Sequence, residues 1–122
     1  TRFSRVDYRD VAEVAAIALT EESLAYGTFE LCAPGILCRT DIAAMLTDIL
    51  GHKIRVGTID RHAVRDAPSD MITMFEHYDH GGLLGNPLTL KTILGREPRT
   101  LHAYFEELAE QRVAGGQGPV PP

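Results

Sequence analysis

The stretch that decides the predicted fold of this chain reads Val6-Asp7-Tyr8-Arg9-Asp10-Val11-Ala12-Glu13-Val14-Ala15-Ala16. It predicts the end of a strand, a sharp turn and a helix, because Asp10 stands where a helix N-cap belongs and Glu13 follows three residues later. Asp7 would then lie in the turn before the helix. The helix is rich in alanine and has apolar residues on nearly every side, so we expect it to be well buried.

The composition of the chain bounds its size and its partners. Its 122 residues suffice for one compact domain, with 44% hydrophobic and 24% charged residues. The net charge is −5 and the basic residues form no run, which argues against nucleic acid or an anionic membrane as a partner. No apolar run approaches the ~20 residues that span a bilayer.

Cys32 and Cys38 are the two cysteines of the chain, and their spacing is not Cys-x-x-Cys. Two cysteine ligands alone do not complete a zinc site. We therefore expect two reduced, ordinary residues of a cytoplasmic protein, since a free cysteine packs as a small hydrophobic side chain.

Three short strands and five helices are predicted along the chain. Strand-like runs occupy residues 2–8, 28–32 and 53–59. The second helix is the clearest, because its apolar residues form one stripe: Ile42, Met45, Leu46, Ile49 and Leu50. Caps and glycines mark the helix ends: Thr40 to Gly51 for the second helix, Pro68-Ser69 to Gly81-Gly82 for the third, Asn86-Pro87 to Gly95 for the fourth, and Thr100 at the start of the last.

The predicted order of elements is β-α-β-α-β-α-α-α, so the expected fold class is α/β. Residues 1–113 would form the folded part, and residues 114–122, rich in glycine and proline, a flexible tail. Three strands make a thin sheet. A thin sheet with a well-buried first helix indicates that another part of a protein covers it.

The glycine-rich run does not predict a nucleotide-binding loop. Gly81-Gly82-Leu83-Leu84-Gly85 follows a predicted helix, whereas a phosphate-binding turn needs a strand before it and a helix after it. We expect a helix stop and a loop there. No tyrosine is followed four residues later by lysine, and no Gly-x-Ser-x-Gly sequence is present.

The segment Glu76-His77-Tyr78-Asp79-His80 holds the densest group of potential metal ligands. His77 and His80, or Glu76 and His80, would share one side of a helix. A metal site needs a further ligand, and the choices are His52, His62 and His102. Nothing in the sequence selects one of them. We therefore expect no metal and interpret the segment as a polar helix end, where histidines are favourable near the negative end of the dipole.

The third helix has an apolar stripe formed by Met71, Met74, Phe75 and Tyr78. Interpreted as core, the stripe packs the helix against its neighbours. Interpreted as function, it lines an adaptable apolar pocket, since methionine is flexible and tyrosine keeps a polar tip. The residues alone favour the core interpretation.

Residues 2–12 resemble the strand and the Val-Asp-x-x-Asp-Val-Ala helix of NmrA-like proteins, which are atypical short-chain dehydrogenase/reductases. Residues 27–34, Gly-Thr-Phe-Glu-Leu-Cys-Ala-Pro, are similar to the following strand of that family. Residues 40–51 and 53–56 match its next helix and strand. Leu94-Gly95-Arg96-Glu97-Pro98-Arg99-Thr100-Leu101 resembles its late Gly-Arg-x-Pro-x-Thr/Ser-Leu turn. The resemblance spans nearly the whole chain except the tail.

The resemblance implies the carboxy-terminal part of such a protein, a partial Rossmann-like segment with a small α/β substrate-binding subdomain. In the family an N-terminal Rossmann half binds NAD(P). Only five residues precede the opening stretch, so we expect that half to lie outside this chain and transfer no catalytic or cofactor-binding residue. The third helix corresponds to a region that lines the substrate cleft in the family. Met74, Phe75 and Tyr78 are therefore the substrate-binding residues that the resemblance implies.

Three functions are compatible with these observations. The first is the substrate-binding part of an NAD(P)-dependent NmrA-like oxidoreductase, which binds a small-molecule substrate in the parent protein and does not catalyse by itself. The second is part of a dinucleotide-sensing regulator that acts through protein–protein contacts, and the third is a free-standing small binding domain. For the first, we expect contact with the N-terminal Rossmann half, or self-association, through an exposed apolar face.

Overall fold

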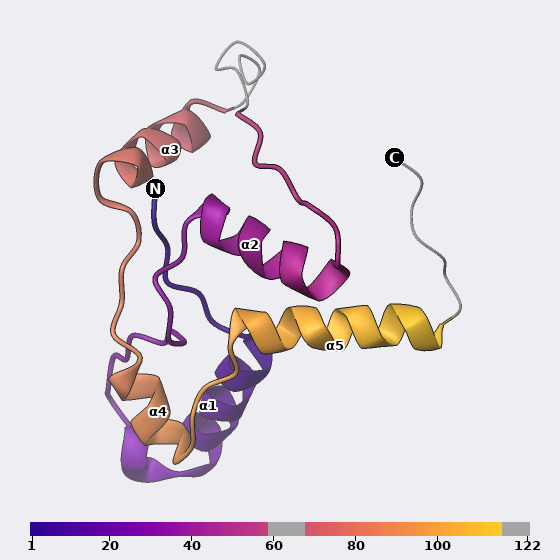
Figure 1. The fold of residues 1–122 in the computed structure, drawn as a ribbon. Helices are drawn as coiled ribbons and strands as arrows, with labels where there is room; N and C mark the ends of the chain where they lie inside the picture. The colour runs from indigo at the N-terminus through magenta and orange to yellow at the C-terminus, as the bar shows by residue number, and fades with distance from the viewer. Residues whose placement is uncertain (59–67, 116–122) are drawn as a thin grey trace.

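The computed structural model describes residues 1–58 and 68–115, and this part of the chain is built from helices (Figure 1). The elements are α1 (Tyr8–Thr20), the 3-10 turn η1 (Glu22–Leu24), α2 (Arg39–Leu50), α3 (Ser69–Gly81), α4 (Leu88–Leu94) and α5 (Leu101–Ala114). The described residues form isolated β-bridges but no sheet. The predicted α/β class, with its order β-α-β-α-β-α-α-α, is therefore wrong, and the fold is all-α.

The first predicted strand, residues 2–8, forms β-bridges only at Phe3. The Phe3 amide donates to Leu37 O and the Leu37 amide donates back to Phe3 O, both at 3.0 Å. On the other side, the Ser4 amide donates to Leu83 O at 2.7 Å. Both pairings are isolated bridges, and α1 already begins at Tyr8. The segment therefore connects two loops but does not extend into a ladder.

The other two predicted strands, residues 28–32 and 53–59, also form no strand in the described part of the chain. The Ile54 amide donates to the Thr47 hydroxyl at 3.0 Å, which is a side chain of α2. Residue 59 lies outside the described residues. An alternating apolar pattern predicts one face of a strand, but a strand forms only where a partner backbone lies in register beside it.

Helix α1 begins before the residue that was predicted to cap it. Asp7 is the N-cap, with an extended backbone (φ −76°, ψ 128°), and its carboxylate accepts from the Arg9 amide at 2.8 Å. Asp10 lies inside the first turn of the helix and is fully buried. The capping prediction for Asp10 is thus wrong, and its carboxylate is used for another contact.

The other helices begin and end close to the predicted residues. Helix α2 has Cys38 as its N-cap instead of Thr40. Gly51 and Gly95 end α2 and α4 in the left-handed conformation, with φ values of 69° and 66°. The Thr100 side chain caps α5 by accepting from a backbone amide of its first turn. The glycine stops at Gly51 and Gly95 and the Thr100 cap are therefore confirmed, and the Thr40 cap is wrong.

Two helix pairs organise the molecule. Helix α1 contacts α4, and α2 contacts α5, as Figure 1 shows. Within the described part of the chain, α3 contacts no other helix. Among the described residues, the buried apolar ones are Val14, Cys32, Ala33, Ala43 and Leu90. None of them comes from α3, so the small core lies between the other elements.

Helix α1 is less buried than its composition predicts. Only Asp10 and Val14 are buried among its residues. Tyr8 and Leu19, at opposite ends of the helix, are 86% and 87% exposed. The prediction of a well-buried first helix is therefore wrong for this chain, because α4 covers one side of the helix and leaves the other side open.

The glycine run after α3 is a helix stop, as the sequence predicts. Helix α3 ends at Gly81, and Gly82 follows with a φ of 70°. A Cβ atom on Gly82 would lie 2.3 Å from Arg2 O. Glycine is required there because the chain both turns with a positive φ and passes close to the backbone of the N-terminal segment.

Two further expectations concern membranes and the tail. Across residues 1–58 and 68–115, no helix has both the length and the apolar character needed to cross a membrane. Helix α5 continues to Ala114, one residue beyond the predicted boundary at 113. From residue 116 on, the predicted tail lies outside the described residues.

Candidate functional site

A buried carboxylate joins α1 to the turn between α4 and α5. Arg96 Nη2 donates to Asp10 Oδ1 at 2.8 Å, the Arg99 amide donates to Asp10 Oδ2 at 2.7 Å, and Arg99 Nη1 also contacts Oδ1. Both guanidinium groups also donate to the Glu13 carboxylate, one turn along α1. Arg96 Nη2 lies 2.6 Å from Oε2, and Arg99 Nη1 lies 2.8 Å from Oε1. We call Asp10, Glu13, Arg96 and Arg99 the Asp10 cluster. It joins residues that are 86 positions apart in the chain.

Both acids of the Asp10 cluster are held in the ionised form. Burial by itself raises the pKa of the Asp10 carboxyl, but the hydrogen bonds from Arg96 and Arg99 outweigh burial and hold that pKa below its ordinary value. The same two arginines lower the pKa of Glu13. Two carboxylates and two guanidinium groups balance in charge. The cluster therefore acts as a structural joint and not as an acid–base centre.

A cavity of about 680 Å³ lies next to this joint, between the start of α1 and helix α5. We call it the α1–α5 cavity. Its size falls within the range typical of small-molecule sites. Its walls come from residues 5–9, from Ala33, and from Arg99, Thr100, Leu101, Tyr104, Glu107, Leu108 and Gln111.

Arg9 connects two walls of the α1–α5 cavity. Its Nη2 lies 2.6 Å from Asp7 Oδ2, and its Nη1 lies 2.8 Å from Glu107 Oε2 on α5. The hydrogen bonds from Arg9 lower the pKa of Asp7, and the two carboxylates raise the pKa of Arg9. Because Arg9 and Glu107 are about half exposed, their pairing contributes little to stability. It links the start of α1 to α5.

The remaining wall of the cavity is mainly apolar and carries two tyrosine rings. Val6, Leu101 and Leu108 supply aliphatic surface, and Tyr8 and Tyr104 supply the rings. Tyr104 is 42% exposed, so part of its ring is accessible from solvent. An apolar wall with a few fixed polar groups is the usual composition of a ligand site.

A second cavity, of about 520 Å³, lies between α2 and α5. It shares Leu108 and Gln111 with the α1–α5 cavity, so α5 separates the two. Its other walls are mostly aliphatic and aromatic, from Leu46, Ile49, Leu50, Phe105 and Ala109. It has fewer polar groups that would orient a ligand. The α1–α5 cavity is therefore the stronger candidate site.

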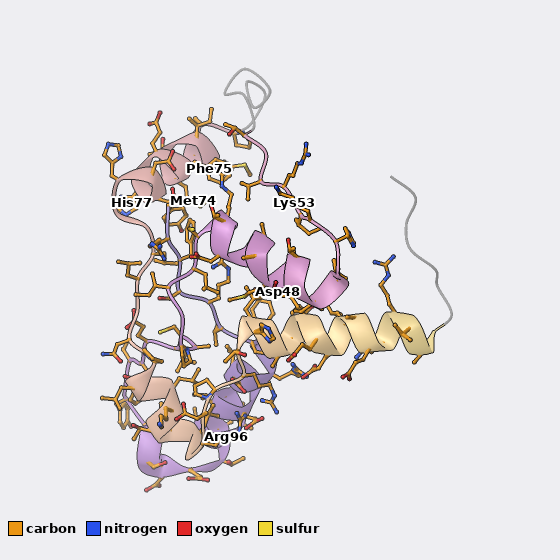
Figure 2. The ribbon with its side chains drawn as sticks, viewed as in Figure 1. Asp48, Lys53, Met74, Phe75, His77 and Arg96 are labelled. Atoms are coloured by element: carbon orange, nitrogen blue, oxygen red, sulfur yellow. The ribbon has the colours of Figure 1, made fainter. Side chains whose placement is uncertain are left out.

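The substrate-binding residues predicted from the resemblance lie elsewhere. Met74 and Phe75 project from α3, at the opposite end of the molecule from Arg96 (Figure 2), and are 41% and 47% exposed. The Tyr78 ring packs edge-on against Phe3, with ring centroids 5.4 Å apart. None of Met74, Phe75 and Tyr78 lines either cavity. Their role in substrate binding stays a prediction.

The histidines considered as metal ligands have other neighbours. His80 Nδ1 lies 2.7 Å from Glu76 O, and His102 Nδ1 lies 3.2 Å from Glu106 Oε2. His62 lies outside the described residues. In the part of the chain that the structure describes, no three histidine, cysteine or acidic side chains come together as a metal site would need.

The two cysteines are both free. Cys32 is buried in the core, and burial raises the pKa of its thiol. Cys38 is half-buried at the start of α2. The Cys32 thiol therefore stays protonated and packs as a small apolar group.

The glycine run after α3 does not fit a dinucleotide. Its amides are used within the protein: Gly82 donates to Tyr78 O at 2.8 Å, and Gly85 donates to the Ser4 hydroxyl at 2.9 Å. The Leu83 amide between them donates to the backbone of the N-terminal segment. Phosphate binding needs such amides to be directed at the ligand, and these three amides are directed at oxygens of the protein instead.

Sequence reasoning missed Arg96 and Arg99 as partners of Asp10. A signal was available in the spacing of charges, because Asp10 and Glu13 are three residues apart, as are Arg96 and Arg99. Two acids on one side of a helix match two arginines on one side of a turn. The spacing alone does not show that the turn between α4 and α5 packs against α1. That contact makes Asp10 a buried ion-pair partner instead of a helix cap.

No protein-family model, curated protein or solved structure matches this chain. The likeness to NmrA-like proteins therefore rests on the segments described above. The Asp10 cluster and the α1–α5 cavity are the features from which a function can be argued.

Proposed function

We propose that this chain is the substrate-binding, carboxy-terminal part of an NAD(P)-dependent NmrA-like oxidoreductase and does not catalyse by itself. One observation carries the proposal. Two stretches that carry the resemblance, residues 6–12 and 94–101, are joined in space by the Asp10 cluster. Both stretches also line the α1–α5 cavity. The residues that resemble the family thus build a cavity suited to a small molecule, which supports a substrate-binding role.

In this proposal the chain holds and orients the substrate. The Asp10 cluster holds the turn that bears Arg99 and Thr100, and Arg9 links α1 to Glu107 on α5. In this proposal NAD(P) is bound by a separate N-terminal Rossmann half, as in the NmrA-like proteins that the chain resembles. We also propose a cytoplasmic location, for which the two unpaired cysteines are suited.

Exposed apolar side chains support a contact with that N-terminal half. Leu19 on α1 is 87% exposed, and Met71, Met74 and Phe75 on α3 are 41–47% exposed. Groups of exposed apolar side chains mark contact surfaces in many proteins. We propose that the N-terminal half covers these faces and that the isolated chain self-associates through them.

The test uses the protein encoded by the complete coding sequence. We expect it to contain an N-terminal Rossmann half and to oxidise NADPH with a carbonyl acceptor, while the 122-residue chain alone shows no turnover. In the complete protein, Tyr104→Ala should raise KM about fivefold with little change in kcat, since a lost ring contact is worth ~1 kcal/mol. Tyr26→Ala is the matched control, because Tyr26 is fully exposed and does not line the cavity.

Three results would overturn the proposal. One is a coding sequence without a nucleotide-binding half, which would favour the free-standing binding domain. Another is NADPH binding without turnover, which would favour the dinucleotide-sensing regulator. The last is a KM that Tyr104→Ala leaves unchanged.

A further inference from the structure

Arg5, on the wall of the α1–α5 cavity, is held in place at both its backbone and its side chain. The amide of the buried Ala33 donates to Arg5 O at 2.6 Å. Arg5 Nη1 donates to the carbonyl oxygens of Phe3 and Leu37, both at 3.2 Å. Because these contacts are made with the main chain, the fold itself positions the guanidinium group.

The contacts of Arg5 leave one edge of its guanidinium group available. An arginine side chain has five N–H donors, and Nη1 supplies two of them. Within residues 1–58 and 68–115, Arg5 Nε and Nη2 have no hydrogen-bond acceptor and Arg5 has no acid partner. The Phe3 ring, with its centre 5.7 Å from the guanidinium carbon, attracts the charge but carries no acid. Two parallel N–H donors on one edge match the two oxygens of a carboxylate.

The other arginines on the wall differ from Arg5, because they already have acid partners. Arg9 Nη2 lies 2.6 Å from Asp7 Oδ2, and Arg9 Nη1 lies 2.8 Å from Glu107 Oε2. Arg99 belongs to the Asp10 cluster, where it pairs with both acids. Among the described residues, Arg5 is therefore the cation on this wall that has no carboxylate of its own.

The rest of the wall suits the apolar body of a ligand. Leu101 and Leu108 supply aliphatic surface, and the rings of Tyr8 and Tyr104 lie on the same wall. Arg5 itself is half-buried, so its charge is partly removed from water, and an anion at its available edge would offset the lost hydration. A carboxylate at Arg5 and an apolar body beside the rings would use both parts of the wall.

We infer that the α1–α5 cavity binds small carboxylates with an apolar body, and that Arg5 recognises the carboxylate. The inference names the substrate class for the proposed substrate-binding role, and it rests on that role. Binding is measured on the 122-residue chain, whereas the oxidoreductase proposal is measured as NADPH turnover by the complete protein. The two can therefore fail separately.

The first experiment compares three head groups on one phenylethyl body: 3-phenylpropanoate (anionic), 3-phenylpropanamide (neutral) and 3-phenylpropylammonium (cationic). Binding to the 122-residue chain at pH 7 is followed by NMR shifts, including the shift of the Arg5 Nε–H signal. We expect a Kd of about 1 mM for 3-phenylpropanoate, the affinity usual for a ligand of this size. The amide should bind at least about fivefold more weakly, because a hydrogen bond to an ionised acceptor is roughly twice as strong as a neutral one.

The cationic ligand controls for the charge of the whole chain. The net charge is −5, so long-range attraction alone would favour 3-phenylpropylammonium. Preference for the carboxylate therefore requires a cation at the binding site. We expect the ammonium ligand to bind more weakly than the carboxylate.

Variants of two arginines test the place of binding. Arg5→Gln removes the charge and keeps an amide donor for the main-chain carbonyls, so it should weaken 3-phenylpropanoate at least about fivefold. Arg2→Gln is the matched control, because it makes the same change of charge in the same segment. Arg2 does not line the cavity and pairs with Asp41 at 3.2 Å, so this variant should leave the affinity unchanged.

Two further variants separate charge, geometry and apolar contact. Arg5→Lys keeps the charge but has no two-donor edge, so it should weaken 3-phenylpropanoate about threefold. Tyr104→Ala should weaken it about fivefold, since it removes a ring from the wall. Each variant is first shown to be folded by its urea unfolding transition, and Arg5→Lys takes the place of Arg5→Gln if the latter does not fold.

Any of three results would overturn the inference. They are an amide that binds as tightly as the carboxylate, a folded Arg5 variant that binds 3-phenylpropanoate as tightly as the unmodified chain, and a folded chain that binds none at about tenfold the expected Kd. If the ligands behave as expected but the complete protein shows no NADPH turnover, the cavity is a carboxylate site and the oxidoreductase proposal is the one that fails.

Discussion

Helices α1 and α3 each have 13 residues, yet the molecule holds them by different means. Helix α1 contacts α4, buries Asp10 and Val14, and is joined to the α4–α5 turn by the Asp10 cluster. Helix α3 has no buried residue and contacts no other helix in the described part of the chain. The sequence predicted that α1 would be buried through its apolar residues and that Asp10 would cap it. In the structure most of its apolar residues are not buried, and Asp10 is.

The difference shows that an apolar stripe does not by itself determine where a helix packs. Both helices expose large apolar side chains, with Leu19 on α1 87% exposed and Phe75 on α3 47% exposed. Helix α1 differs from α3 by its contact with α4 and by one buried carboxylate that accepts from three donors. A paired buried charge fixes the position of a helix because its partners must lie in a defined geometry.

Removal of that carboxylate should have the largest effect on the protein. Asp10→Ala should lower the free energy of unfolding by about 3 kcal/mol, because it leaves the Arg99 amide and two guanidinium groups without their buried acceptor. Urea unfolding at pH 7 measures the loss. The matched control is Glu13→Ala on the same helix. Glu13 is 43% exposed, so the control should cost no more than about 1 kcal/mol. Equal losses in the two variants would contradict a special role for burial at Asp10.

Acid should loosen the same joint in the unmodified protein. The folded-state pKa of Asp10 is lowered, so the stability it contributes is fully present above the pKa of the unfolded chain, near 4, and is lost as the pH falls through the folded value. The loss is about 1.4 kcal/mol for each unit by which the pKa is lowered. Unfolding free energies between pH 7 and pH 3 measure it. Asp10→Asn should flatten this dependence, and an unchanged slope would show that other acids dominate.

The sequence predicted the helix ends well and the strands badly, for a physical reason. Gly51, Gly95 and Thr100 end or cap their helices through contacts with residues a few positions away, so local sequence is sufficient. A strand at residues 28–32 or 53–59 depends on a partner backbone, which a local pattern does not contain. Asp10 failed in the same way, because the choice between a cap and a buried ion pair depends on residues 86 positions later.

The candidate site was hard to predict for the same reason. The walls of the α1–α5 cavity come from residues 5–9 and from positions 99 to 111, and neither segment suggests a pocket alone. The apolar stripe of α3 drew attention because it is local and regular. In the structure its members Met74 and Phe75 are exposed and line neither cavity. A pocket between distant segments can be predicted only when the contact that brings the segments together, here the Asp10 cluster, is known.

The weaker attachment of α3 gives the smallest expected effect. Tyr78 packs edge-on against Phe3, so Tyr78→Ala should cost about 1 kcal/mol in the free energy of unfolding. The location of the effect tests whether α3 unfolds separately from α1. Amide hydrogen exchange should become faster across α3 and stay unchanged in α1. Thr73→Ala, at an exposed position of α3 outside the apolar stripe, is the control and should change neither. If exchange rises equally in α1 and α3, the two helices unfold as one unit. The contrast between a helix held by a buried charge and a helix held by the Tyr78–Phe3 ring contact and an exposed Thr1–Asp79 hydrogen bond would then not hold.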